Sequence, residues 1–184
     1  MANELTVKNR LYIRKLVYSA LFLALAYVLP FVTGQIPQIG AMLCPMHIPV
    51  LLCGYVCGWP WGLGVGLIVP LLRSFTVGMP PLFPSAVGMA CELAAYGALA
   101  GITYRLLPKK PWGVYVSLLI SMIGGRIVWG LVRFLLAGAA HTEFPFAAFV
   151  SGAVTSAVPG ILAQIVLVPM LVLVLRRAKL TLNE

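Results

Sequence analysis

Four ionisable side chains lie inside long apolar stretches of the sequence, where charged residues are rare. They are Arg73, Glu92, Arg126 and Arg133. A charge inside an apolar segment is costly, so it indicates a functional site or a close partner. Three arginines against one carboxylate leave two positive charges without an internal partner. Because arginine stays protonated and its planar fork suits a carboxylate or a phosphate, the sequence predicts a site that favours a small anion.

The spacing of these residues adds further candidates on the same helix faces. Arg126 and Arg133 are seven residues apart, which is about two helical turns, so they share a face near which Trp129 also lies. Tyr96 follows Glu92 by four residues and shares its face in the same way. We therefore count Trp129 and Tyr96 among the candidate ligand-binding residues.

The composition identifies the elements that must position these side chains. Of the 184 residues, 61% are hydrophobic and only 9% are charged. Soluble domains usually hold about 25% charged residues, because a small globule cannot cover its surface with apolar groups. The sequence therefore predicts an all-α integral membrane protein that forms a single transmembrane domain over residues 1–184.

The net charge of +9 comes from basic residues at the ends of the chain and in one short loop, and this placement argues against nucleic-acid binding. Ten of the thirteen lysines and arginines lie there: Lys8, Arg10, Arg14, Lys15, Arg105, Lys109, Lys110, Arg176, Arg177 and Lys179. Clustering of this kind is the positive-inside signature of membrane proteins. We expect both termini and the loop at 105–113 to be cytoplasmic.

Six apolar segments fit the length of membrane spans, which need roughly 20 residues or fewer if the segment is broken. They are expected at residues 11–32, 47–58, 61–77, 83–106, 112–138 and 146–175. The second is short and follows a Pro/Gly-rich stretch at 34–46, which is predicted to be irregular and to dip into or cap a cavity. The stretch at 62–70, "GLGVGLIVP", indicates close helix packing through its glycines.

The expected depth of the charges depends on the rise of about 1.5 Å per residue. By that rise Arg73 and Arg133 lie roughly 8 Å below the outer ends of their spans, and Glu92 roughly 13 Å. We expect these three to converge in the outer half near His47, which can donate a hydrogen bond to a ligand. Arg126 is expected to lie deeper, at about 18 Å.

A purely structural explanation of these charges stays open. Arg73 and Glu92 can form a salt bridge between helices, and Arg133 can extend its charged end to the outer membrane surface. The sequence does not distinguish this arrangement from ligand binding.

The sequence holds no motif of a hydrolase, a kinase or a nucleotide-binding loop. The four cysteines lie in apolar context without a Cys-x-x-Cys pair, as expected of small buried side chains. We therefore expect no catalytic residue and no metal site, and we expect any ATP to be used elsewhere.

The first span carries small residues four positions apart, at Ala20 and Ala24. Small side chains at this spacing let two helices approach closely in lipid. The pair predicts a helix–helix contact on this face.

The basic first span "RKLVYSALFLALAYVL", the size and the six spans resemble the substrate-binding S components of energy-coupling factor (ECF) vitamin transporters. The stretch from Met46 to Arg105 is similar to the core of one subgroup. The resemblance implies an S-component-like bundle in a prokaryotic plasma membrane, with a vitamin site near the outer face. It also implies docking on a transmembrane T component through Ala20 and Ala24. Two cytoplasmic ATPase subunits would use the ATP, so that this chain needs no cofactor.

The resemblance leaves the vitamin open between pantothenate, queuosine precursors, cobalamin and pyridoxine-like compounds. The excess positive charge favours pantothenate, whose carboxylate Arg73 or Arg133 would bind. Glu92, Tyr96 and His47 would hydrogen-bond its amide and hydroxyls, and Trp129 and Phe83 would surround its apolar part. A different class of protein, a stand-alone secondary transporter, is the alternative, and it would move substrate without ATPases.

Overall fold

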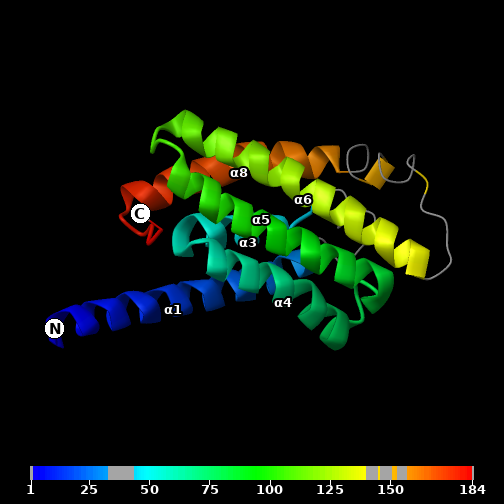
Figure 1. Cartoon of the computed structure of the whole chain (residues 1–184), viewed down its shortest axis with the longest axis horizontal. Helices are drawn as coiled ribbons and strands as arrows, with labels where there is room; N and C mark the ends of the chain where they lie inside the picture. Colours follow the sequence, from blue (N-terminus) through cyan, green and yellow to red (C-terminus); the bar gives the residue numbers. More distant parts are fainter. Residues whose placement is uncertain (1, 33–43, 140–144, 146–150, 153–156, 184) are drawn as a thin grey trace.

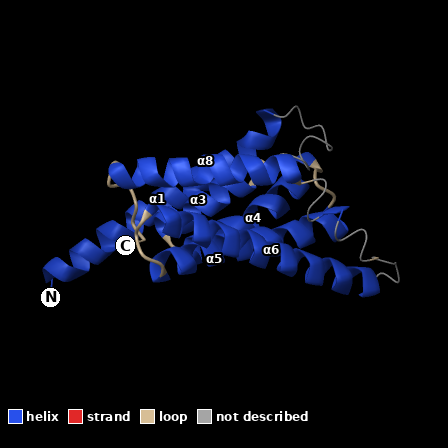
Figure 2. Cartoon of the chain, turned by 90° about the horizontal axis from the view of Figure 1, so that it is seen from above, coloured by secondary structure: helices blue, strands red, loops and turns tan. Residues whose placement is uncertain are grey.

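The computed structural model describes residues 2–32, 44–139, 145, 151–152 and 157–183. Helices make up most of these residues, and no strand occurs among them (Figure 2). The elements are α1 (Ala2–Val32), α3 (His47–Cys57), α4 (Trp59–Val77), η1 (Leu82–Ala86), α5 (Val87–Leu106), α6 (Pro111–Ala139) and α8 (Val158–Arg177). Within the described residues, five helices are long and apolar enough to cross a membrane, and α3 is a shorter apolar helix. The predicted all-α membrane fold is confirmed.

The basic segments share one end of the bundle. The N-terminal part of α1, the α5–α6 loop and the end of α8 all lie at this end (Figure 1). Arg176 donates a hydrogen bond to the backbone carbonyl of Lys109, which joins the end of α8 to that loop. By the positive-inside rule this is the cytoplasmic end.

Aromatic side chains mark the same end. Trp59 and Trp112, near the starts of α4 and α6, are 45% and 52% exposed. The rings of Tyr12 and Trp61 pack with their centroids 5.3 Å apart. Tryptophan and tyrosine favour the membrane–water interface, where one side of the ring is apolar and the other is hydrated. Their position supports an interface at this level of the bundle.

The short helix α3 lies in the interior of the bundle. Ten of its eleven residues are buried, and it packs against α1, α4, α5 and α8. A helix that is apolar on all sides is stable only when it is surrounded in this way. It begins after a turn in which the His47 N–H donates to the Cys44 carbonyl, and it ends at Gly58, whose φ of 102° breaks the chain before α4. The described part of the irregular stretch is limited to Cys44–Met46, and residues 34–43 lie outside the described residues.

Helices α4 and α5 approach each other through glycines. A Cβ added to Gly97 would lie 2.3 Å from the Gly62 carbonyl oxygen, and one added to Gly62 would lie 2.6 Å from that of Gly97. No real side chain tolerates such distances, so the two backbones are in direct contact. The close packing expected for residues 62–70 is confirmed.

The last helix begins later in the chain than the sequence predicted. A continuous span was expected over residues 146–175, but α8 begins at Val158. Pro159 lies in its first turn, where the fixed φ of proline favours a helix start. Most of residues 146–156 lie outside the described residues.

The glycine contact predicts a difference between two neighbouring glycines of α4. Gly62→Ala should destabilise the protein by about 1–3 kcal/mol, because overpacking forces the backbones apart. Gly64→Ala is the control, since nothing lies within 4 Å of a Cβ at Gly64, and it should be neutral or stabilising. Thermal unfolding of the purified protein in detergent measures both. Equal melting temperatures for the two variants would contradict the direct contact.

Candidate functional site

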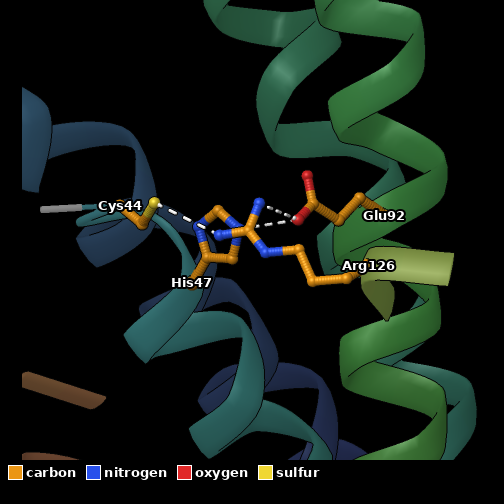
Figure 3. Close-up of polar contacts among 4 residues, drawn as sticks. All are labelled: Cys44, His47, Glu92 and Arg126. Carbon is orange, nitrogen blue, oxygen red and sulfur yellow. Dashed lines mark hydrogen bonds and ion pairs between the residues drawn. The ribbon is translucent and has the colours of Figure 1, made fainter. Parts of the chain in front are cut away.

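The buried carboxylate of Glu92 forms an ion pair with a positively charged side chain of a neighbouring helix. Arg126 Nη1 lies 2.8 Å from Glu92 Oε1, and His47 Nε2 lies 3.5 Å from the same oxygen. The side chains of Glu92 and His47 are 2% and 3% exposed, and that of Arg126 is 15% exposed. Figure 3 shows the three groups converging from α3, α5 and α6 on one point. We call Cys44, His47, Glu92 and Arg126 the polar cluster.

Packing around the polar cluster holds the imidazole in place. The Tyr96 ring meets the His47 ring edge-on, with the centroids 5.1 Å apart. Tyr96 in turn lies against Gly125 of α6, where an added Cβ would be 2.8 Å from the ring. Glu92 and Tyr96 therefore contact His47 from one face of α5, as their spacing predicted. The absence of a side chain at Gly125 lets α6 approach closely enough for Arg126 to reach Glu92.

Cys44 completes the polar cluster at the start of α3. Its Sγ lies 3.9 Å from Arg126 Nη2 (Figure 3). The sequence analysis treated Cys44 only as a small buried side chain. Its spacing of three residues from His47 was the signal that was missed.

Four buried polar atoms of the polar cluster make no hydrogen bond within the described part of the chain. They are His47 Nδ1, His47 Nε2, Glu92 Oε1 and Arg126 Nε. The contacts to Glu92 Oε1 are thus ion pairs without hydrogen-bond geometry. Buried polar atoms in native proteins are nearly always satisfied by protein, water or a ligand. A concentration of such atoms makes the polar cluster the candidate ligand site.

Arg73 lies in a different environment from the one expected. Its Nη1 donates a 2.7 Å hydrogen bond to the backbone carbonyl of Tyr27. Its guanidinium carbon lies 4.9 Å from the centre of the Phe31 ring and 5.7 Å from that of Tyr27. Arg73 therefore joins α4 to the outer part of α1. The salt bridge considered between Arg73 and Glu92 is wrong, because Arg126 and His47 take that place.

Arg126 joins the polar cluster, which the depth estimate did not predict. It was expected below the level of Glu92, yet the two charges are in contact. The estimate counted residues from the outer end of each helix and assumed that these ends are level. It placed the two residues about 5 Å apart in depth, and the long arginine side chain spans that difference.

The remaining predicted residues fall into two groups. The guanidinium of Arg133 lies 6.0 Å from the centre of the Trp129 ring, so these two do share a face of α6 with Arg126. An added Cβ at Gly152 would be 2.7 Å from Trp129, which places residue 152 against this ring. Phe83 is 52% exposed in η1 and is not among the buried side chains of the polar cluster. Its predicted contact with a ligand stays a prediction.

A second buried polar group was also missed from the sequence. Gln164 of α8 is 1% exposed, and its Oε1 has no hydrogen-bond partner among the described residues. A glutamine in the apolar run "GILAQIVLV" was the available signal. No group of three or more metal-binding side chains occurs in the described residues.

A bundle of apolar helices around a buried polar cluster defines a multi-pass membrane protein with an internal polar site. The family model described as "ECF transporter, substrate-specific component" matches residues 14–172, and the chain belongs to this family. The family consists of transporter components rather than enzymes, and its members in general associate with T and ATPase components. Searches of curated proteins and of solved structures found no match.

The ion pair predicts a non-additive effect of substitution. Arg126→Leu should destabilise the protein by about 3–5 kcal/mol, because it leaves the Glu92 carboxylate buried without a counter-charge. Adding Glu92→Gln to Arg126→Leu should recover most of this loss. Thermal unfolding in detergent of both single variants and the double variant measures the coupling. Additive losses would mean that the two charges do not stabilise each other.

Proposed function

We propose that this chain is the high-affinity binding subunit of an ATP-driven importer in a prokaryotic plasma membrane, and that its substrate is pantothenate. Membership in the S-component family supports the role of binding subunit. The single observation that carries the site is the set of buried polar atoms without hydrogen bonds on His47, Glu92 and Arg126. A small ligand with an amide and hydroxyls would supply their missing partners.

The charges of the site favour an anionic ligand over a cationic one. Glu92 is already neutralised by Arg126 at 2.8 Å, so it offers a cation no uncompensated carboxylate. Arg133 adds a positive charge on the same face of α6, beside Trp129. We infer that the carboxylate of the ligand contacts Arg133, and that its amide and hydroxyls contact His47 and Arg126. Arg73 lies on α4 beside α1, whereas Arg133 lies on the same helix as Arg126, so its position makes Arg133 the better of the two arginines considered for this role.

Pantothenate binding is tested by calorimetry on the purified subunit, with each of the candidate vitamins as titrant. Arg133→Gln should weaken pantothenate binding roughly 10- to 150-fold, because a hydrogen bond to a charged group is worth about 1.5–3 kcal/mol. Arg177→Gln, which makes the same change at the exposed cytoplasmic end of α8, is the control and should bind normally.

The opposite pattern of binding would contradict pantothenate as the substrate. A cationic queuosine precursor would then be the tightest ligand, and Glu92→Gln would weaken its binding while Arg133→Gln would not. Cobalamin as the tightest ligand would equally remove pantothenate.

The face of α1 that points away from the bundle supports docking on a T component. Ala20 and Ala24 are exposed, and large apolar side chains that are also exposed, such as Val17 and Leu21, lie near them. The buried side of the same helix, which includes Phe22, packs against the bundle. We propose that the T component contacts the exposed small residues, and that its ATPase partners use ATP while this chain performs no catalysis and holds no cofactor.

Docking predicts a separation between assembly and substrate binding. Ala20→Trp or Ala24→Trp should abolish assembly with the T component and ATPases, because a bulky side chain prevents close helix approach. Substrate binding by the isolated subunit should stay nearly unchanged. Ile123→Trp, on an exposed part of α6, is the control and should assemble normally. Co-purification and uptake into liposomes measure assembly, and calorimetry on the isolated subunit measures substrate binding. Unchanged uptake by the Ala20→Trp and Ala24→Trp variants, or uptake by the chain alone, would instead favour a stand-alone secondary transporter.

A further inference from the structure

The chain that follows α8 turns back and contacts the cytoplasmic end of α3. After α8, the Leu180 N–H donates to the Leu175 carbonyl, which closes a turn. The Leu182 N–H then donates a 2.8 Å hydrogen bond to the Val56 carbonyl. The Asn183 side chain, 8% exposed, lies in the bundle beyond this point.

The Asn183 amide joins two helices. Its Nδ2 donates to the Gly54 carbonyl of α3 at 3.3 Å and to the Gly101 carbonyl of α5 at 3.0 Å. An amide nitrogen has two N–H donors, so both are used. Gly58 leaves room for this contact, because an added Cβ there would be 3.0 Å from Asn183 Oδ1.

The contact from Leu182 pairs a backbone carbonyl that the end of α3 leaves without a partner inside the helix. The last four carbonyls of an α-helix have no partner within the helix. Helix α3 ends at Cys57, so the Val56 carbonyl is one of these four, and Leu182 supplies its donor. The Gly54 carbonyl accepts from the Gly58 N–H and from Asn183.

The two helices joined by Asn183 are those that carry His47 and Glu92. His47 precedes Gly54 by seven residues and Glu92 precedes Gly101 by nine, so the amide lies roughly 10–14 Å from the polar cluster along each helix. The contact at the cytoplasmic end therefore constrains the position of α3 along the axis of α5. At the other end of α3, no side chain caps the helix, and there the side chains of His47 and Glu92 lie 3.5 Å apart.

We propose that Leu182 and Asn183 are positioning residues that set the alignment of α3 on α5 and thereby hold His47 against Glu92. Asn183 acts through the helices and does not touch a ligand. The alignment itself is a property of the chain, and only its consequence for vitamin binding rests on the proposed function.

The imidazole of His47 reports the alignment directly. The 184-residue chain with His141→Gln leaves His47 as its single histidine, and NMR in detergent micelles then follows the imidazole signals without any ligand. Asn183→Asp keeps the shape of the side chain but removes both N–H donors, and it should shift these signals. Asn183→Ala removes the donors without adding a charge and should shift them in the same way. Asn9→Asp, on the exposed part of α1, is the matched control and should leave them unchanged.

Two outcomes decide the proposal. Shifted imidazole signals in a variant that is still folded at the measuring temperature support it, and binding of pantothenate should then weaken roughly 2- to 30-fold. Unchanged signals in Asn183→Asp and Asn183→Ala, together with lower melting temperatures, would mean that the contact only stabilises the fold. If no vitamin binds the unmodified protein, the proposed function fails. The imidazole signals then still decide whether Asn183 sets the alignment of α3 on α5.

Discussion

Glu92 and Arg126 can stay inside an apolar bundle only as a pair, because either charge alone would lie in a medium that cannot solvate it. The pair requires α5 and α6 to lie in contact with these two residues at one level. Gly125 permits that contact against the Tyr96 ring, and the same ring positions the imidazole of His47. The geometry of the site thus follows from neutralising one buried carboxylate.

Close backbone contacts give the bundle the rigidity that such a site needs. Direct contact between Gly62 and Gly97 brings α4 onto α5, and α3 lies buried beside them. In lipid, apolar area alone gives little drive for helices to associate, so packing and hydrogen bonds must do so. Asn183 supplies such hydrogen bonds at the cytoplasmic end, while the ion pair supplies the polar contact further along α5.

The three arginines of the apolar segments show how surroundings decide the role of one residue type. Arg126 neutralises a carboxylate, Arg73 holds α1 through a carbonyl and two rings, and Arg133 lies beside Trp129. Counting charges in the sequence treated them as equivalent. The proposed contact with an anionic vitamin therefore uses Arg133, which lies on the same helix as Arg126.

The sequence by itself determined the helical membrane fold, the side on which the basic segments lie and the presence of a polar site. These follow from composition, span length and the cost of charge in lipid, which are all local properties of the chain. It also placed Tyr96 on the face of Glu92, because helical periodicity is local. Only the tertiary structure decided which arginine pairs with Glu92, that Cys44 joins the polar cluster, and that residues 182 and 183 reach α3. Those outcomes depend on the relative heights and rotations of different helices, which are set by contacts between residues far apart in the sequence.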